Sequence, residues 1–128
     1  MVSSASDRAR LVRLGAVAMA FGVALGAFGA HGLRSRLAPD LLAIYETGVR
    51  YHLVHALGLF VAAWLAGEDQ RRAARIAGVL LVVGLLLFSG SLYLLALTGI
   101  RGFGAVTPLG GVAWIAAWVL IAWRVRIR

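Results

Sequence analysis

Four stretches of the sequence contain no Asp, Glu, Lys or Arg: residues 14–33, 51–67, 76–100 and 102–123. They are 20, 17, 25 and 22 residues long. A helix needs about 20 apolar residues to cross roughly 30 Å of hydrocarbon. The sequence therefore predicts an all-α integral membrane protein, a four-transmembrane-helix bundle forming one domain over residues 1–128. The expected spans are about 11–33, 49–66, 74–98 and 107–124.

The composition also favours a membrane protein, because 62% of the residues are hydrophobic and only 14% are charged. A soluble domain is close to half apolar and about a quarter charged. The net charge of +8 comes from thirteen Arg grouped at the ends of the uncharged runs, which favours membrane lipids over nucleic acid as partners. Neither Cys nor Lys is present, so thiolate and Schiff-base chemistry are excluded.

The Arg residues also predict an orientation, since basic residues in short loops favour the cytoplasmic side of a membrane. Nine Arg lie in the N-terminal segment, the loop between the second and third spans, and the C-terminal tail. In a four-span chain these three segments share one side. Arg34, Arg36, Arg50 and Arg101 lie on the other side. We therefore expect both termini in the cytoplasm.

The first predicted helix has small residues on one face. Ala18, Gly22, Gly26 and Ala30 recur at every fourth position. Small residues at this spacing allow two helices to approach closely in lipid. We expect this contact to lie within the chain, with a contact between subunits as the alternative.

The second predicted helix is too long for a simple span. Pro39 suits its first turn, and a helix from there to residue 66 would be about 42 Å long. Because this length exceeds the bilayer, residues 39–48 are expected to form an interfacial extension. Its side chains available to face lipid are Leu41, Leu42, Ile44 and Tyr45.

Polar side chains gather at one end of the predicted bundle. Antiparallel neighbours place the end of the first helix beside the start of the second, and the end of the third beside the start of the fourth. At 100° per residue, Tyr51, His52 and His55 share a face of the second helix, which we expect to point toward His31. The predicted polar network or ligand site in the outer half of the membrane contains His31, Tyr51, His52, His55, Ser89, Ser91 and Tyr93.

Glu46 and Arg50 lie on roughly the opposite side of the same helix. Their i, i+4 spacing predicts an interfacial ion pair. This pair would be separate from the polar network, because it would face the membrane surface rather than the bundle.

The polar network has three interpretations, since polar groups at membrane depth are costly and each needs a partner. It could fix helix register, or it could form a proton-linked or small-ligand pocket, because His titrates near physiological pH. Alternatively, His31, His52 and His55 could bind Zn or Cu, although zinc-binding helices more often space two His at i, i+4 than at i, i+3. No catalytic residue and no cofactor are predicted, because no carboxylate is placed to orient a His.

Four ordered sequence blocks carry a family resemblance. They are GAFGAHGL (26–33), YETGVRYHLVHALGL (45–59), LFSGSLYLLALTG (87–99) and TPLGGVAW (107–114). Together they resemble the domain of unknown function 423 family, small bacterial inner-membrane proteins similar to the animal transmembrane-protein-256-like group. The resemblance implies a four-helix, multi-pass protein of the bacterial cytoplasmic (inner) membrane. It implies no activity and no catalytic or binding residue.

These observations favour a non-enzymatic structural, assembly or ligand-binding membrane component. Helices rich in small residues bury little among themselves, so we also expect a homo-oligomer. One alternative is a small transporter or channel, proton- or ion-linked, although a conducting path needs polar residues through the full membrane thickness. The other alternative is a membrane metal-binding protein.

Overall fold

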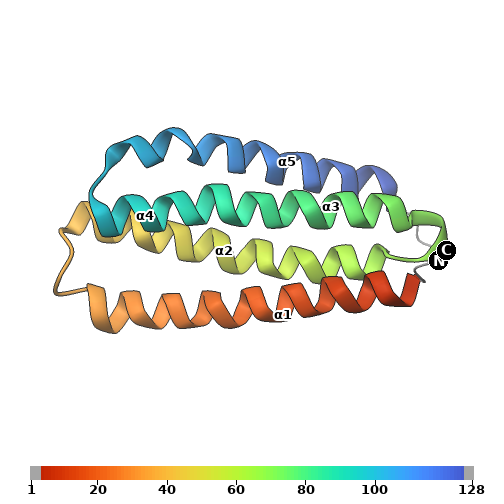
Figure 1. The fold of residues 1–128 in the computed structure, drawn as a ribbon, viewed down its shortest axis with the longest axis horizontal. Coiled ribbons are helices and arrows are strands. Elements are labelled where there is room, and N and C mark those ends of the chain that lie inside the picture. The colour runs from red at the N-terminus through yellow and green to blue at the C-terminus, as the bar shows by residue number, and fades with distance from the viewer. Residues whose placement is uncertain (1–3, 126–128) are drawn as a thin grey trace.

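The computed structural model describes residues 4–125 and folds them into a bundle of long helices (Figure 1). The start of α1, the α2–α3 turn and the end of α5 lie at one end, here the terminal end; the α1–α2 and α4–α5 connections lie at the other, here the loop end. Arg126 and Arg128 of the charged tail lie outside the described residues. The elements are α1 (Ser4–Phe28), η1 (Gly29–Leu33), α2 (Pro39–Leu65), η2 (Glu68–Gln70), α3 (Arg71–Gly84), η3 (Leu85–Ser89), α4 (Gly90–Thr98), η4 (Arg101–Ala105) and α5 (Thr107–Arg124).

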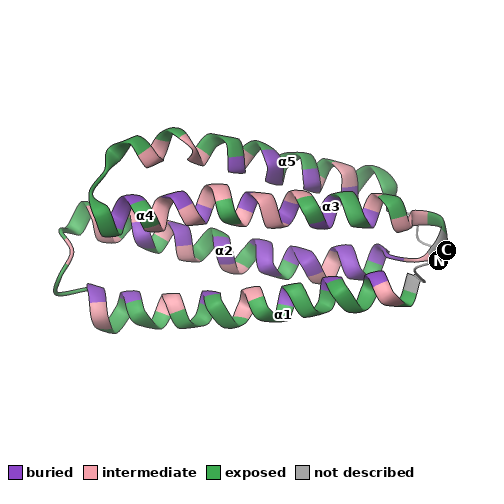
Figure 2. Ribbon diagram, viewed as in Figure 1, coloured by how far each residue is buried: buried purple, intermediate pink, exposed green. Residues whose placement is uncertain are grey.

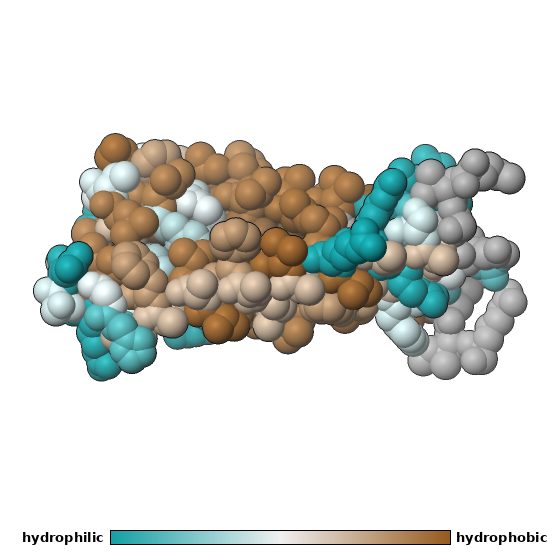
Figure 3. Space-filling view, turned by 60° about the horizontal axis from the view of Figure 1, so that its bottom comes forward, coloured by the Kyte–Doolittle hydropathy of each residue, from teal (hydrophilic) through white to brown (hydrophobic). Residues whose placement is uncertain are grey.

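Four continuous helical stretches are long and apolar enough to cross a membrane, which confirms the predicted fold class. Hydrophobic residues cover most of the length of the molecule and hydrophilic residues collect at its two ends (Figure 3). All four stretches begin earlier than the uncharged runs, because turns that contain charged residues continue the helices past the apolar segments. The stretches are Ala5–Leu33, Pro39–Leu65, Arg71–Thr98 and Arg101–Arg124.

The central helix of the bundle is α2. In the most apolar 18-residue segment of α2, 50% of the residues are buried (Figure 2). The corresponding fractions are 17% for the stretch that contains α1 and 28% for the stretch that contains α5. The main core lies where α2, α3 and α5 meet, around Leu59, Leu81 and Trp114. The first helix packs chiefly on α2, so most of its apolar side chains are left to face lipid.

The small residues of α1 pack against α2, as expected for a contact within the chain. A Cβ atom added at Gly22 would lie 2.7 Å from Leu53 Cδ2, and one added at Gly26 would lie 3.2 Å from Val49 Cγ1. These glycines therefore allow the two helices to approach closely. Ala30 departs from the pattern, because it is exposed.

The start of α2 differs from the expectation most at Tyr45, while Leu42 and Ile44 are half-buried against the core cluster around that residue. The helix begins with Pro39 in its first turn, but the Tyr45 side chain is fully buried rather than facing lipid. Its hydroxyl donates a hydrogen bond to the Leu25 carbonyl of α1 at 2.6 Å. The ring fits because residue 29 is glycine. A Cβ atom added at Gly29 would lie 2.6 Å from Tyr45 Cε1. An acceptor inside the bundle thus satisfies a phenol that was expected at the interface.

Two wider π turns interrupt the long helices, and each begins four residues after a carbonyl that accepts a side-chain hydrogen bond. The turn η1 begins at Gly29, four residues after Leu25, whose carbonyl accepts the tyrosine hydroxyl. The turn η3 begins at Leu85, four residues after Leu81, whose carbonyl accepts the Trp114 indole N–H at 3.1 Å. At the second turn the Leu81 carbonyl still accepts the Leu85 backbone N–H, so the indole bond is added to the i→i−4 bond rather than replacing it. Such turns occur frequently at functional sites.

Candidate functional site: a His-centred polar network beside a lateral groove

The His52 ring connects three helices. It is 8% exposed, and its Nε2 lies 2.8 Å from the Ala18 carbonyl oxygen of α1. Its Nδ1 lies 3.0 Å from the Tyr93 hydroxyl of α4. A carbonyl only accepts, so Nε2 carries the proton in the neutral ring, and the Tyr93 hydroxyl donates to Nδ1. Both nitrogens are therefore committed to protein partners.

The His55 ring takes part in a separate aromatic stack. Its Nδ1 donates to the Tyr51 carbonyl at 2.7 Å, and the ring is 6% exposed. The ring lies on Trp114 of α5, with centroids 3.6 Å apart and planes 8° from parallel. The Tyr51 ring stacks against His55 at 6.0 Å and is 43% exposed. This stack joins α2 to α5 and extends toward the surface.

The two serines hold neighbouring helices together. Ser89, at the end of η3, is fully buried and donates to the Gly48 carbonyl of α2 at 2.8 Å. Ser91 shares a hydrogen bond of 2.6 Å with the Thr107 hydroxyl at the start of α5, and also donates to the Phe88 carbonyl at 2.9 Å. These hydrogen bonds join α2 to η3 and α4 to α5. Among the other predicted site residues, the structure brings His52 to Tyr93 and His55 to Tyr51.

His31 is not brought into this network. It lies in η1 and is exposed, and the described residues contain no group of three His, Cys, Asp or Glu that could hold a metal ion. The three imidazoles, which the sequence offered as an alternative metal site, are therefore not brought together. Helix phase explains this, because His31 follows Gly22 by nine positions, which is about half a turn of rotation at 100° per residue. Gly22 faces α2, so His31 faces away from it.

The predicted Glu46–Arg50 ion pair is also absent from the described part of the chain, where both side chains are exposed. An exposed pair gains little from association, so spacing alone does not hold it together. At the loop end the ion pair that forms is instead Asp40 with Arg101, at 2.7 Å. It joins the first turn of α2 to the α4–α5 connection.

The sequence reasoning missed a buried acid at the terminal end. Asp7 of α1 is 3% exposed and accepts a hydrogen bond from the Arg71 guanidinium of α3. Asp7 precedes the uncharged run of α1, and the Arg71 hydrogen bond holds the pKa of its carboxyl below the ordinary 3.8. A sequence signal existed, because α1 and α3 begin at the same end in a four-span chain, which places this one acid beside the Arg71–Arg75 cluster.

A lateral groove opens between α1 and α3–α4, with α2 as its floor. Its wider part has a volume of about 340 Å³, within the range of about 300–1,000 Å³ typical of ligand pockets. His52 and Tyr93 line it, but their polar atoms already bond to each other and to Ala18. The remaining lining is apolar and includes Leu14, Val17, Phe21, Leu25, Leu85 and Leu86.

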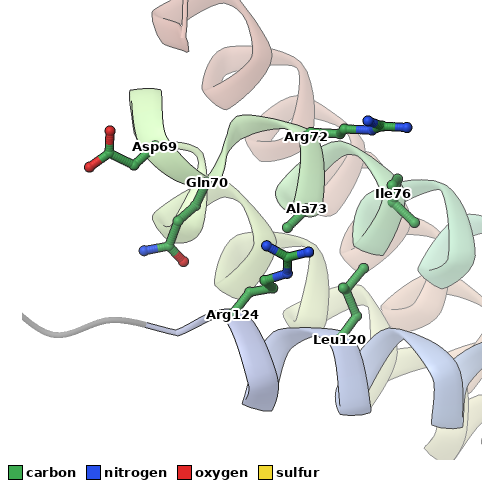
Figure 4. A pocket seen from close by; sticks show the side chains of 7 residues that line it. All are labelled: Asp69, Gln70, Arg72, Ala73, Ile76, Leu120 and Arg124. Carbon is green, nitrogen blue, oxygen red and sulfur yellow. The ribbon is translucent and has the colours of Figure 1, made fainter.

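A second hollow lies at the terminal end between the start of α3 and the end of α5 (Figure 4). It has a volume of about 380 Å³ and is lined by Gln70, Arg72 and Arg124, among others. The buried Gln70 Oε1 has no hydrogen-bond partner among the described residues. This hollow is lined by two Arg and one Asp at the terminal end, whereas the groove runs along the apolar length of the bundle.

Comparison with known proteins places this chain in a family. A model of the family described as Protein of unknown function (DUF423) matches residues 25–111. The UPF0382 membrane protein YwdK of Bacillus subtilis is 50% identical over 109 residues, which cover 84% of this chain and 89% of the relative. The UPF0382 membrane protein SH2409 of Staphylococcus haemolyticus is 44% identical over 108 residues, covering 84% and 88%. No solved structure matches the chain. The matched region contains the site residues of α2, η3 and α4 but neither Ala18 nor Trp114, and the chain belongs to the DUF423 family of membrane proteins.

Proposed function

We propose that this protein is a non-enzymatic ligand-binding component of the bacterial cytoplasmic membrane, which holds a lipid-soluble molecule in the groove between α1 and α3–α4. The observation that carries the proposal is the groove itself, a preformed apolar hollow of about 340 Å³ that opens sideways. A lateral opening admits molecules from the bilayer rather than from water. The groove lies along the apolar length of the bundle and its lining is apolar, and both properties favour a hydrophobic ligand.

The polar network supports a structural rather than a catalytic role for the histidines. Both His52 nitrogens are hydrogen-bonded, one of them to a backbone carbonyl. The Ser89 hydroxyl donates to a carbonyl rather than to a base, so nothing in its surroundings would activate it as a nucleophile. The network instead fixes the spacing of α1, α2 and α4, and so maintains the walls and floor of the groove.

A groove-filling substitution tests the proposal. In Leu14→Trp the indole ring would occupy the groove. Val23→Trp, nine positions away, places the same ring on the opposite side of α1. Both positions are exposed, at 48% and 61%. The protein is purified in detergent, and the retained lipid-soluble molecules are identified by mass spectrometry. We expect Leu14→Trp to lose a molecule that wild type and Val23→Trp retain.

The same preparations separate the rival functions. If all three proteins retain the same molecules in the same amounts, the groove is not a ligand site and the proposal fails. Proteoliposome flux of protons or common ions above that of empty vesicles would instead support a transporter. Stoichiometric metal by elemental analysis would support a metalloprotein built on residues other than a three-His group.

We also propose that both termini face the cytoplasm and that chains associate. The terminal end carries most of the Arg residues, which supports the orientation. Reporter fusions at each end of the chain would give a periplasmic signal if it is wrong. The exposed faces of α1 and α5 support association, because they leave broad apolar surfaces for a neighbour. Cross-linking in native membranes should yield dimers or larger species, and monomers alone would contradict it.

A further inference from the structure

The groove has a cationic mouth at its terminal end. Arg10 of α1 and Arg75 of α3 line this part, which has a volume of about 300 Å³, together with Asp7. Arg75 is 60% exposed, and its Nε lies 4.0 Å from an Asp7 oxygen. Asp7 is 3% exposed and receives its hydrogen bond from Arg71. One carboxylate thus lies among the guanidinium groups of Arg71, Arg75 and Arg10, and the mouth keeps a net positive charge toward an anion.

The mouth is continuous with the apolar part of the groove. Leu14 and Val82 line both parts, one on each wall. From Leu14 to Leu25 the helix rises about 16 Å at 1.5 Å per residue. One leaflet of a bilayer contains roughly 15 Å of hydrocarbon, half of about 30 Å. The apolar part therefore matches the depth that one acyl chain occupies below its headgroup.

We infer that the ligand is an anionic phospholipid whose phosphate lies between Arg10 and Arg75 and whose acyl chain lies along the groove; this inference rests on the proposed function. The charge of the mouth complements a phosphate, for which Arg is well suited because its guanidinium can form paired hydrogen bonds. The chain needs no polar partner from the groove, and His52 and Tyr93 offer none because they bond to each other.

The experiment compares two headgroups on one scaffold. Wild-type protein in nonionic detergent is mixed with phosphatidylglycerol or with phosphatidylcholine carrying identical acyl chains, and bound lipid is counted by native mass spectrometry. Each Arg near the surface favours an anionic lipid by about fivefold. Two Arg therefore predict that phosphatidylglycerol binds about 30-fold more tightly, the equivalent of ~2 kcal/mol.

A matched pair of charge variants locates the headgroup. Arg10→Gln with Arg75→Gln removes both cations of the mouth, and we expect the preference to fall close to onefold while phosphatidylcholine binding is unchanged. Arg8→Gln with Arg72→Gln removes the same charge, but neither residue lines the groove, and Arg72 lines the other hollow. This control should keep the preference. Thermal unfolding in detergent checks that every variant is folded.

The outcomes distinguish this inference from the proposed function. One outcome is that wild type binds both lipids equally while Leu14→Trp weakens the binding of both. In that case the groove binds lipid whatever the charge of the headgroup, and only the anionic inference fails. If the preference is lost in the Arg8/Arg72 variant instead, the headgroup binds the other hollow and the inference is wrong. If neither Leu14→Trp nor a second groove-filling variant, Val17→Trp, changes the binding of either lipid, the proposed function fails as well. Dimers that replace bound lipid and disappear in Leu14→Trp would show that a second copy occupies the groove.

Discussion

Two adjacent glycines near the start of α5 are predicted to respond in opposite directions to alanine. A Cβ at Gly110 would lie 2.4 Å from the Phe88 backbone nitrogen and 2.9 Å from the Leu87 carbonyl carbon. A Cβ at Gly111 would have its nearest contact at 3.8 Å, on the Phe88 ring. Favourable contacts between heavy atoms occur at about 3.5–4.0 Å. Alanine at 110 must therefore push α5 away from η3, since backbone atoms cannot rotate aside as a side chain can.

The magnitude follows from two opposing effects. Alanine gains about 1 kcal/mol over glycine inside a helix. Overpacking costs about 1–3 kcal/mol, and close contact with backbone atoms places Gly110→Ala at the upper end. We therefore expect Gly111→Ala to stabilise the protein by up to ~1 kcal/mol. Gly110→Ala should destabilise it by about 2 kcal/mol, the overpacking cost less the helix gain.

The assay is reversible unfolding by SDS in mixed micelles, followed by the fluorescence of the native Trp residues. The free energy of unfolding is measured for wild type and for each alanine variant, and the two variants should differ by about 3 kcal/mol. Gly110→Ala as stable as Gly111→Ala would refute the reasoning, because it would show that α5 and η3 are not in close backbone contact.

Three further predictions concern the hydrogen bonds. In a double-mutant cycle with His52→Leu and Tyr93→Phe, the coupling free energy of unfolding should be about 0.6–1.7 kcal/mol, and zero coupling would contradict the bond. Because the folded Asp7 carboxyl has a lowered pKa, its stabilising effect is present above the ordinary 3.8 and is lost as pH falls below it. Wild type should therefore lose its stability advantage over Asp7→Asn in SDS unfolding as pH is lowered, and an advantage that stays constant with pH would contradict this. Tyr45→Phe removes the hydrogen bond to the Leu25 carbonyl, so the free energy of unfolding in SDS should fall by about 1 kcal/mol; unchanged stability would contradict the bond.

The number and course of the helices could be predicted from the sequence, because absence of charge over about 20 residues is a strong constraint in a bilayer. The exact ends could not, since Arg-containing turns at residues 5–13 and 71–75 remain helical beyond the apolar runs. The close contact of α1 with α2 was also predictable, because Gly22 and Gly26 recur at the spacing that permits it.

The candidate site was predictable at the level of neighbouring helices but not of individual partners. Helix phase predicted that His52 and His55 are buried, but not that His52 faces α1 and α4 while His55 and Tyr51 stack toward α5. His31 could have been set aside by the same phase count. Hydrogen bonds to carbonyls, such as His52 to Ala18, leave no trace in the sequence because every residue offers a carbonyl. The lateral groove likewise depends on how far α1 is held from α3, which no local pattern encodes.

The π turn at residues 85–89 has a consequence for the long helix that contains it. Such a turn accommodates about one extra residue, so it rotates the helical segment after it by about 100° relative to an unbroken helix. The stretch from 71 to 98 is thus two short rods with separate angular settings, α3 packed mainly on α5 and α4 packed on α2. An insertion or deletion of one residue at the junction would rotate one segment about its axis relative to the other, while the residues that form each packing face would stay the same.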